Sequence, residues 1–128
     1  MTVGRGSTGA LGEHAEQLAF RFLIDRGLQP VARNFRTRGG EIDLILLDGD
    51  CLAFVEVRCR RSARFTDPEL TVDRHKQRKL VRTAALFAAR HRAYAQHVMR
   101  FDVVAIEGDE CPAIHWIKDA FRPNDSAL

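Results

Sequence analysis

The sequence predicts a single α/β domain with a mixed central β-sheet flanked by helices, in the order α-β-β-β-α-β-β. Its 128 residues, 45% of them hydrophobic, suffice for one domain with one core. Two long segments carry apolar residues at helical spacing, and five shorter apolar segments are bounded by turn residues. Because strands separate the two helices, a helix on each face is the natural way to bury the sheet.

The two patterns alternate along the chain. The first helix is expected to begin near Ser7 or Thr8, either of which can cap it, and to end before Gly27. The strand after it contains Pro30, which cannot donate a ladder hydrogen bond, so this strand is expected at a sheet edge. The other expected boundaries are 28–35 for that strand, 36–40 for a basic loop, 41–47 and 51–59 for a hairpin around Asp48-Gly49-Asp50, 60–71 for a polar connection, 72–94 for the second helix, 99–106 for a strand and 113–121 for a last strand or irregular segment.

The sequence shows no targeting signal, and its cysteines follow no disulfide or zinc-binding pattern. No apolar run approaches the roughly 20 residues of a membrane helix, and the first nine residues lack the apolar core of a secretory signal. Cys51, Cys59 and Cys111 are odd in number and widely spaced, which argues against a disulfide framework or a structural zinc site. We expect a cytoplasmic protein without membrane contact, with flexible ends at 1–8 and 122–128 and a domain spanning 9–121.

The positive charge is mild in amount and uneven in distribution. The net charge is +3, and seventeen of the 20 cations are arginine, whose planar fork suits phosphate. A basic stripe beside an acidic centre suits a polyanionic partner, whereas the alternative is an ordinary solvated surface. The clustered cations are Arg58, Arg60, Arg61 and Arg64, then Arg74, Lys76, Arg78, Lys79 and Arg82.

Two acids interrupt the two most apolar strands of the chain. Asp43 and Glu56 stand in the middle of these strands, where a charge is costly unless something pairs with it. Side chains alternate along a strand, so Asp43 shares a face with Glu41, and Glu56 shares a face with Arg58. If the hairpin places these faces together, Asp43, Glu56 and Arg58 converge, with Glu41 at the rim.

Two neighbouring carboxylates repel each other unless a proton or a cation intervenes. Magnesium prefers one or two protein carboxylates and completes its shell with water and phosphate oxygens. Such a metal polarises a phosphate, generates hydroxide from bound water and stabilises the leaving oxygen. The residues therefore favour phosphodiester hydrolysis with Mg²⁺ or Mn²⁺. The alternative is a pair of acids bridged to arginines such as Arg58, with no metal.

The residues of this hairpin resemble a known nuclease core. Gly40 to Ile45 followed by Phe54 to Arg58 resembles the PD-(D/E)xK nuclease pattern. The chain more closely resembles the YraN family of small bacterial proteins, which is similar in fold to type II restriction endonucleases and archaeal Holliday-junction resolvases. The resemblance implies a restriction-endonuclease-like domain. It covers roughly residues 9–121 and continues in Lys76 to Leu80, Arg100 to Val104 and Ile114 to Phe121.

The resemblance implies roles for individual acids. Asp43 and Glu56 match the two metal-binding acids of the core. The family also has an acid on the first helix, which Glu16 matches best because it flanks the apolar stripe. Glu13 points away from that stripe and, like Glu41, is a secondary candidate.

The sequence departs from the nuclease pattern at Arg58, where the pattern has lysine. Arginine keeps the charge and binds phosphate, but it does not give up its proton near neutral pH. Arg58 is expected to stabilise phosphate or orient water, and Lys76 is a further candidate from the second helix. The residues expected to contact nucleic acid are Arg36, Arg38, Arg60, Arg61, Arg64, Lys76 and Gln77.

Three functions remain open from the sequence, and the third is a structural or interaction protein in which the acids only form ion pairs. The first is a metal-dependent endonuclease acting on structured DNA such as junctions, flaps or ends, since no base-reading module is visible. Symmetric cutting of two strands would need a homodimer. The second is a non-catalytic nucleic-acid-binding module with a degraded site, acting in DNA repair, recombination or uptake. DNA is favoured over RNA, and the sequence identifies no protein partner.

Overall fold

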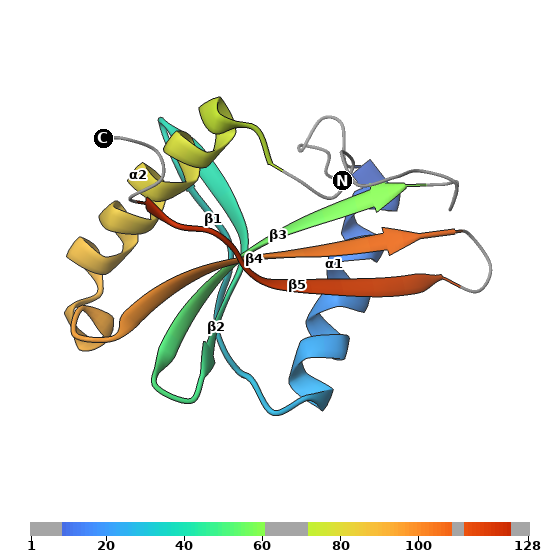
Figure 1. Cartoon of the computed structure of the whole chain (residues 1–128), viewed down its shortest axis with the longest axis horizontal. Coiled ribbons are helices and arrows are strands. Elements are labelled where there is room, and N and C mark those ends of the chain that lie inside the picture. The colour runs from blue at the N-terminus through green and yellow to red at the C-terminus, as the bar shows by residue number, and fades with distance from the viewer. Residues whose placement is uncertain (1–8, 61–71, 109–111, 124–128) are drawn as a thin grey trace.

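The structure, a computed structural model, describes residues 9–60, 72–108 and 112–123. Figure 1 shows two helices and five strands in the order that the sequence predicts, which confirms the fold class. The elements are α1 (Gly9–Asp25), β1 (Gln29–Thr37), β2 (Gly40–Asp48), β3 (Cys51–Arg60), α2 (Arg74–Arg90), the short 3₁₀ helix η2 (Arg92–Tyr94), β4 (Val98–Glu107) and β5 (Ala113–Phe121).

The sheet is mixed, with strand order β1-β2-β3-β4-β5. All neighbours are antiparallel except β3 and β4, which run parallel because α2 lies between them in the chain. The strand that contains Pro30 is an edge, as predicted, and its pairing with β2 is irregular between Pro30 and Ala32. The sheet therefore has one crossover, and that crossover carries the second helix.

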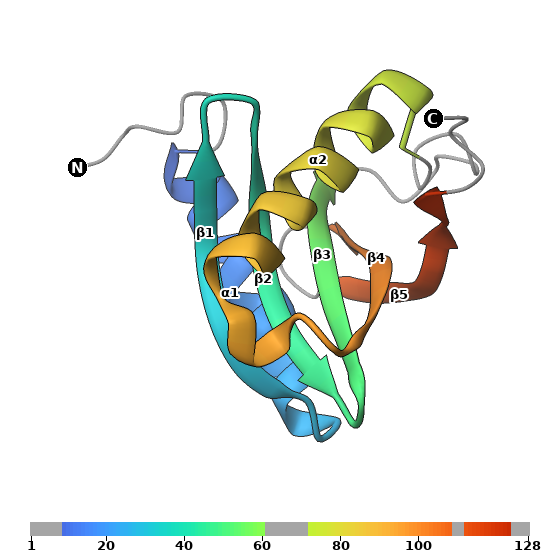
Figure 2. The ribbon, with the colours of Figure 1, turned by 90° about the vertical axis from the view of Figure 1, so that its left-hand side faces the viewer.

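One helix covers each face of the sheet, as Figure 2 shows with α2 in front and α1 behind. Apolar side chains point alternately to the two faces along the strands, but on β2 the alternation shifts between Ile42 and Leu44, which lie in different cores. The α1 core contains Ala15, Ala19, Leu23, Leu44, Leu46, Val55 and Val104. The α2 core contains Ile42, Ile45, Phe54, Leu80, Ala84, Phe87, Phe101 and Val103.

The sheet opens between β2 and β3 at one end. These strands pair from Asp48–Cys51 only as far as Leu44–Val55. Beyond that point the start of β2 stays paired with β1, while β3 stays paired with β4 as far as Arg60–Glu107. Figure 2 shows the turn between β1 and β2 standing apart from the end of β3. The opening begins at the two acids that the sequence singled out.

The first hairpin is tighter than predicted. The expected basic loop over 36–40 is wrong, because β1 continues to Thr37 and β2 begins at Gly40. The Thr37 hydroxyl accepts the N–H of Gly39 at 3.1 Å and donates to the carbonyl of Gly40 at 3.3 Å. A side chain thus closes a turn of two residues, Arg38 and Gly39, and keeps the flanking residues in the ladder.

The second helix is shorter than the predicted 72–94. It begins at Arg74 because the Asp73 carboxylate caps it, accepting the N–H of Lys76 at 2.8 Å. It ends at Arg90, since His91 leaves helical geometry at φ −127° and its ring bonds back to the Phe87 carbonyl at 2.9 Å. The remaining predicted residues form the separate 3₁₀ turn.

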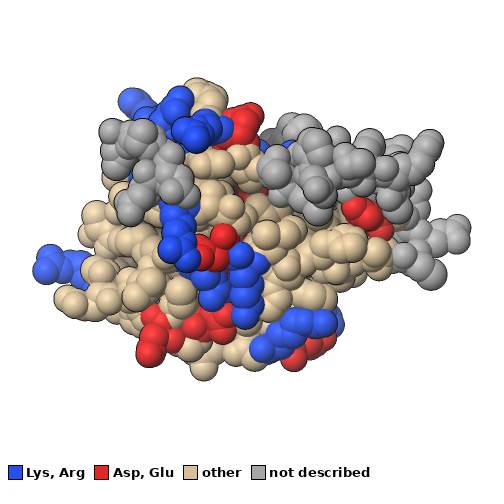
Figure 3. Space-filling model, in the orientation of Figure 1, with Lys and Arg blue, Asp and Glu red and all other residues tan. Residues whose placement is uncertain are grey.

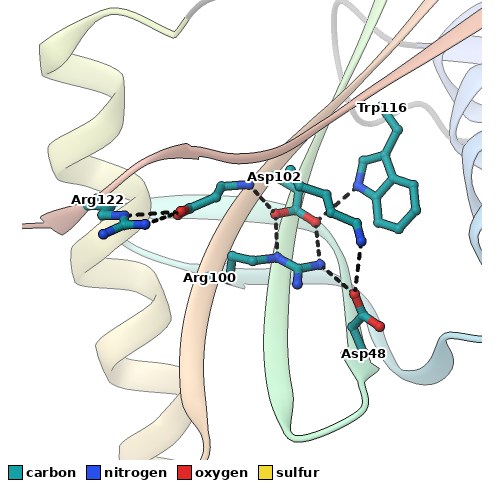
Figure 4. A network of polar contacts seen from close by, with 7 residues as sticks. Asp48, Arg100, Asp102, Trp116 and Arg122 are labelled. Atoms are coloured by element: carbon teal, nitrogen blue, oxygen red, sulfur yellow. Dashed lines mark hydrogen bonds and ion pairs between the residues drawn. The ribbon is translucent and has the colours of Figure 1, made fainter.

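A buried carboxylate, Asp102, joins β4 to β5 and to the turn between β2 and β3 (Figure 4). It accepts hydrogen bonds from the guanidinium of Arg100 at 2.9 Å, the indole of Trp116 at 3.0 Å and the backbone of Asp119 at 2.9 Å. Arg100 also pairs with Asp48 at 2.9 Å. These donors offset the cost of burying the Asp102 charge. The segment Arg100 to Val104, which resembles the family, therefore carries a structural network at Arg100 and Asp102.

Within the described residues, neither helix is both long and apolar enough to cross a membrane. Cys51 and Cys59 are free thiols, half-buried and exposed respectively, whereas Cys111 lies outside the described residues. The ends expected to be flexible lie mostly outside them as well. Arg122 is described, and its guanidinium pairs with Asp119 at 2.6 Å.

Candidate active site

Asp43 lies where β2 leaves β3. Its Oδ2 accepts the backbone N–H of Val57 at 2.8 Å, so a side-chain oxygen takes the place of a ladder carbonyl. Glu56 precedes that N–H in the chain and is buried, with 8% of its surface exposed. The structure therefore brings Asp43 and Glu56 together at the mouth of the opening.

The electrostatics of Asp43 follow from this placement. Burial raises the pKa of Asp43 well above its usual range, and the neighbouring charge of Glu56 raises it further. The Val57 N–H opposes the rise because it stabilises the ionised form, and Glu16 and Glu41 add smaller repulsions. Three carboxylates from α1, β2 and β3 thus act on Asp43, and a cation or a proton at Asp43 would relieve the repulsion.

The cation in contact with this group comes from α2. Lys76 Nζ lies 2.7 Å from Glu56 Oε2, and the lysine side chain keeps 48% of its surface exposed. Because Asp73 caps the helix one turn earlier, the start of α2 is fixed over the end of β3. An ion pair with this much exposure adds little to stability, so the placement of the charge matters more than its contribution to folding.

Arg58 is not brought to the acids. It lies half-buried on β3 opposite Ala105 of β4, and among the described residues no ion pair joins it to Asp43 or Glu56. Residues 56 and 58 do alternate onto one face, as expected. Both residues lie beyond Val55, where β3 stays paired with β4 and no longer with β2.

The helix acid predicted from the family resemblance lies against the strands. Glu16 is buried, with 4% of its surface exposed, whereas Glu13 is exposed, as its place on the helical wheel indicates. Asn34 of β1 lies between two acids. With its amide nitrogen turned toward the carboxylates, which only accept, it donates to Glu16 Oε1 and Glu41 Oε2, each at 3.3 Å. Glu41 also pairs with Arg36 at 3.4 Å.

The donor set suits a hard divalent cation. Among the described residues, no three histidine, cysteine or acidic side chains stand together as a preformed metal-ligand group. Magnesium needs only one or two protein carboxylates, because water and phosphate oxygens complete its shell. Asp43 and Glu56 supply such a pair, and all their ligand atoms are oxygens, which favours Mg²⁺ or Mn²⁺ over softer metals.

A shallow basic hollow adjoins the acids. It has a volume of about 420 Å³ and lies between the β1–β2 turn and α2. Arg36 and Arg38, both predicted to contact nucleic acid, line it together with Lys79, which was not singled out for this role. Glu41 belongs to both the hollow and the acidic group, so the two features are continuous.

Among the side chains that the structure describes, the remaining residues predicted to contact nucleic acid do not line the hollow. Gln77 is committed to the helix start, because its side-chain amide donates to the Val72 carbonyl at 2.6 Å. Arg60 ends β3, and Arg61 and Arg64 lie outside the described residues. On the face in Figure 3, acidic and basic side chains adjoin in small groups and form no broad basic stripe over the described surface.

Close packing fixes the hollow against α2. A Cβ added at Gly40 would meet Thr83 Oγ1 at 2.8 Å, closer than real Cβ atoms approach other atoms. The Thr83 hydroxyl is buried and donates to the Lys79 carbonyl at 2.8 Å. The missing side chain at Gly40 therefore lets the β1–β2 hairpin lie directly on the turn of α2 that carries Lys79.

Comparison with known proteins gives a consistent family. Residues 15–106 match the profile of the uncharacterised protein family UPF0102. A UPF0102 protein of Xanthomonas campestris pv. campestris is 51% identical over 114 residues, covering 89% of this chain and 93% of the relative. One from Halorhodospira halophila is 49% identical over 111 residues, covering 87% and 86%. One from Stutzerimonas stutzeri is 45% identical over 112 residues, covering 87% and 93%. From these matches, the chain belongs to the UPF0102 family.

Proposed function

We propose that this protein binds nucleic acid and hydrolyses phosphodiesters with a divalent metal held by Asp43 and Glu56. The observation that carries the proposal is the pair of neighbouring carboxylates at the opening of the sheet: Glu56 is buried, and Asp43 is partly buried and has a strongly raised pKa. A group perturbed by burial and by a specific charge partner marks a functional-site candidate. Mg²⁺ bound there would relieve the repulsion, polarise the phosphate and generate the attacking hydroxide.

Lys76 supplies the cation that the nuclease pattern places on β3. The pattern expects a lysine at position 58, and this chain has arginine there. Lys76 reaches Glu56 from α2 instead, at 2.7 Å. An ammonium at this place neutralises charge that develops on the phosphate, or it orients a water molecule. It can also exchange a proton, and only this last role is closed to arginine near neutral pH.

The basic hollow supports a polyanionic substrate. Arg36, Arg38 and Lys79 line a hollow that shares Glu41 with the acidic group, so three cations are available to contact backbone phosphates that flank the reacting one. Contacts to backbone phosphates carry no sequence information by themselves, so we infer recognition by shape, as in junctions, flaps or ends of DNA. Cutting both strands of a junction would require two copies of the chain.

The test is cleavage of labelled four-way junctions, flaps and single-stranded DNA with Mg²⁺ or Mn²⁺, against EDTA. We expect metal-dependent cutting that is lost in Asp43→Ala and falls by about 100-fold or more in Lys76→Met, within the range for a positioned charge. Lys79→Met is the matched control, since it removes an exposed lysine from the same helix and should weaken binding only. No cutting of any substrate, with either metal, would refute hydrolysis.

A non-catalytic binding module is the second candidate, and the arginine at position 58 favours it. In that case binding persists without cutting and weakens steeply with salt, because phosphate contacts release counterions. Arg58→Lys distinguishes the two. Cutting that appears only in this variant would identify a degraded site, whereas cutting that is unchanged would assign the lysine role to Lys76.

A further inference from the structure

Asn34 has an unusual backbone for a strand residue. Its φ is +52°, and Asp119 is the other non-glycine residue with positive φ among those described. Its neighbours pair regularly with β2, as Arg33 with Leu44 and Phe35 with Ile42, which places Asn34 opposite Asp43. Left-handed backbone in a strand costs about 1–3 kcal/mol and persists where the surroundings fix it, often at functional sites.

The side chain of Asn34 accounts for this backbone. Its amide group donates to Glu16 of α1 and to Glu41 of β2, each at 3.3 Å. Both carboxylate oxygens lie 3.3 Å from the same amide nitrogen, so a single placement of this side chain serves both partners. Asparagine tolerates left-handed backbone better than most residues and also brings two N–H donors, so it meets both requirements.

A neutral donor is also the appropriate chemistry here. Glu16 and Glu41 both repel charge at Asp43, so holding them close concentrates negative charge that attracts a cation. An arginine or lysine between them would add a positive charge that competes with a metal. An amide holds both carboxylates without adding a charge of its own, and Glu41 has a separate cationic partner in Arg36, at 3.4 Å.

We propose that Asn34 is the positioning residue of the acidic site: its single amide group bridges Glu16 and Glu41 and holds them in place around Asp43. The bridge itself is a property of the metal-free protein. Its consequence for metal affinity rests on the proposed function. Residues that orient metal-binding groups from outside the ligand shell typically contribute about 10- to 100-fold to affinity.

The bridge is tested first without metal, by NMR on the full isotope-labelled chain. As pH falls, the Asn34 side-chain amide signals should shift together with the carboxyl signals of Glu16 and Glu41. The same amide protons should exchange slowly, because they are hydrogen-bonded. If the Asn34 amide signals stay unchanged while both acids become protonated, the bridge is refuted. This outcome does not depend on whether the protein cleaves DNA.

The consequence is tested by Mn²⁺ affinity in calorimetry. Asn34→Gly keeps the left-handed backbone without strain and removes the amide, so affinity should fall about 10-fold or more with little change in Tm. Asp119→Gly is the matched control, since it makes the same exchange at the other left-handed residue, remote from the acids, and should leave affinity unchanged. If wild type binds Mn²⁺ and Asn34→Gly binds it equally well, the positioning role is refuted. If wild type binds none, the proposed function fails, and the NMR titration alone decides the bridge.

Discussion

Gly40→Ala should destabilise the protein and loosen the site at once. The added Cβ would lie 2.8 Å from Thr83 Oγ1, about 0.6 Å short of an ordinary 3.4 Å contact. Overpacking of this kind costs about 1–3 kcal/mol. Alanine also lowers the entropy of the unfolded chain, which returns about 0.4–1 kcal/mol. The expected net loss is about 1–2 kcal/mol, or a Tm lower by about 3–8 °C for a chain of this size.

The same contact identifies its own rescue. Thr83→Ala removes the atom that the new methyl would meet, at the cost of one hydroxyl bond to the Lys79 carbonyl. In that background, Gly40→Ala should be neutral or stabilising. The double-mutant cycle should therefore show a coupling of about 1–3 kcal/mol between positions 40 and 83.

Urea unfolding of the four proteins in the cycle measures this coupling, with Gly39→Ala as the control. A Cβ at Gly39 meets only the Thr37 hydroxyl, at 4.0 Å, so that variant should stay close to wild type. Moving α2 should also disturb the Lys76–Glu56 pair, visible as a shift of the Lys76 side-chain NMR signals. Equal stability of the two alanine variants, or a cycle with no coupling, would refute the close approach of the hairpin to the helix.

Three further outcomes follow from the described contacts. Because the folded-state pKa of Asp43 is raised, its ionisation destabilises the fold as pH rises from the ordinary aspartate range through the raised pKa. Asp43→Asn should therefore raise Tm at pH 8 and leave it almost unchanged at pH 4; equal shifts at both values would contradict the burial argument. Asp102→Asn removes the fully buried charge that pairs with Arg100. The free energy of unfolding, measured in urea, should therefore fall by about 3–5 kcal/mol. A loss below about 1 kcal/mol would mean that the network is not tightly coupled. Finally, Arg38→Ala should reduce the slope of log binding constant against log salt by about 0.9, and an unchanged slope would remove Arg38 from the phosphate contacts.

The central acids were within reach of the sequence. Asp43 and Glu56 each interrupt an apolar strand, and the Asp48-Gly49-Asp50 turn fixes which residues of the hairpin face one another. Strand alternation and the edge position of Pro30 also followed from local chemistry. These features depend on residues a few positions apart, and short-range geometry determines them.

Features that depend on long-range packing were not within reach. The sequence named Lys76 only as a further candidate beside Arg58, because the contact of Lys76 with Glu56 depends on the crossover that returns α2 over the end of β3. By alternation Arg58 shares a face of β3 with Glu56, yet among the described residues it forms no ion pair with Asp43 or Glu56. Asn34 carried a usable signal, since asparagine is depleted in strands and enriched in left-handed backbone, but its partners on α1 and β2 could not be read from that signal.

The acidic site draws residues from five elements: Glu16 from α1, Asn34 from β1, Glu41 and Asp43 from β2, Glu56 from β3 and Lys76 from α2. No fragment of the chain contains it, and no partly folded state that lacks one helix can assemble it. As denaturant is added, the site should therefore be lost in the same transition as global unfolding, which the hydrogen exchange of the slowest core amides reports. It should not be lost at a lower denaturant concentration. A site distributed in this way makes any activity that it supports a direct measure of the fully folded population.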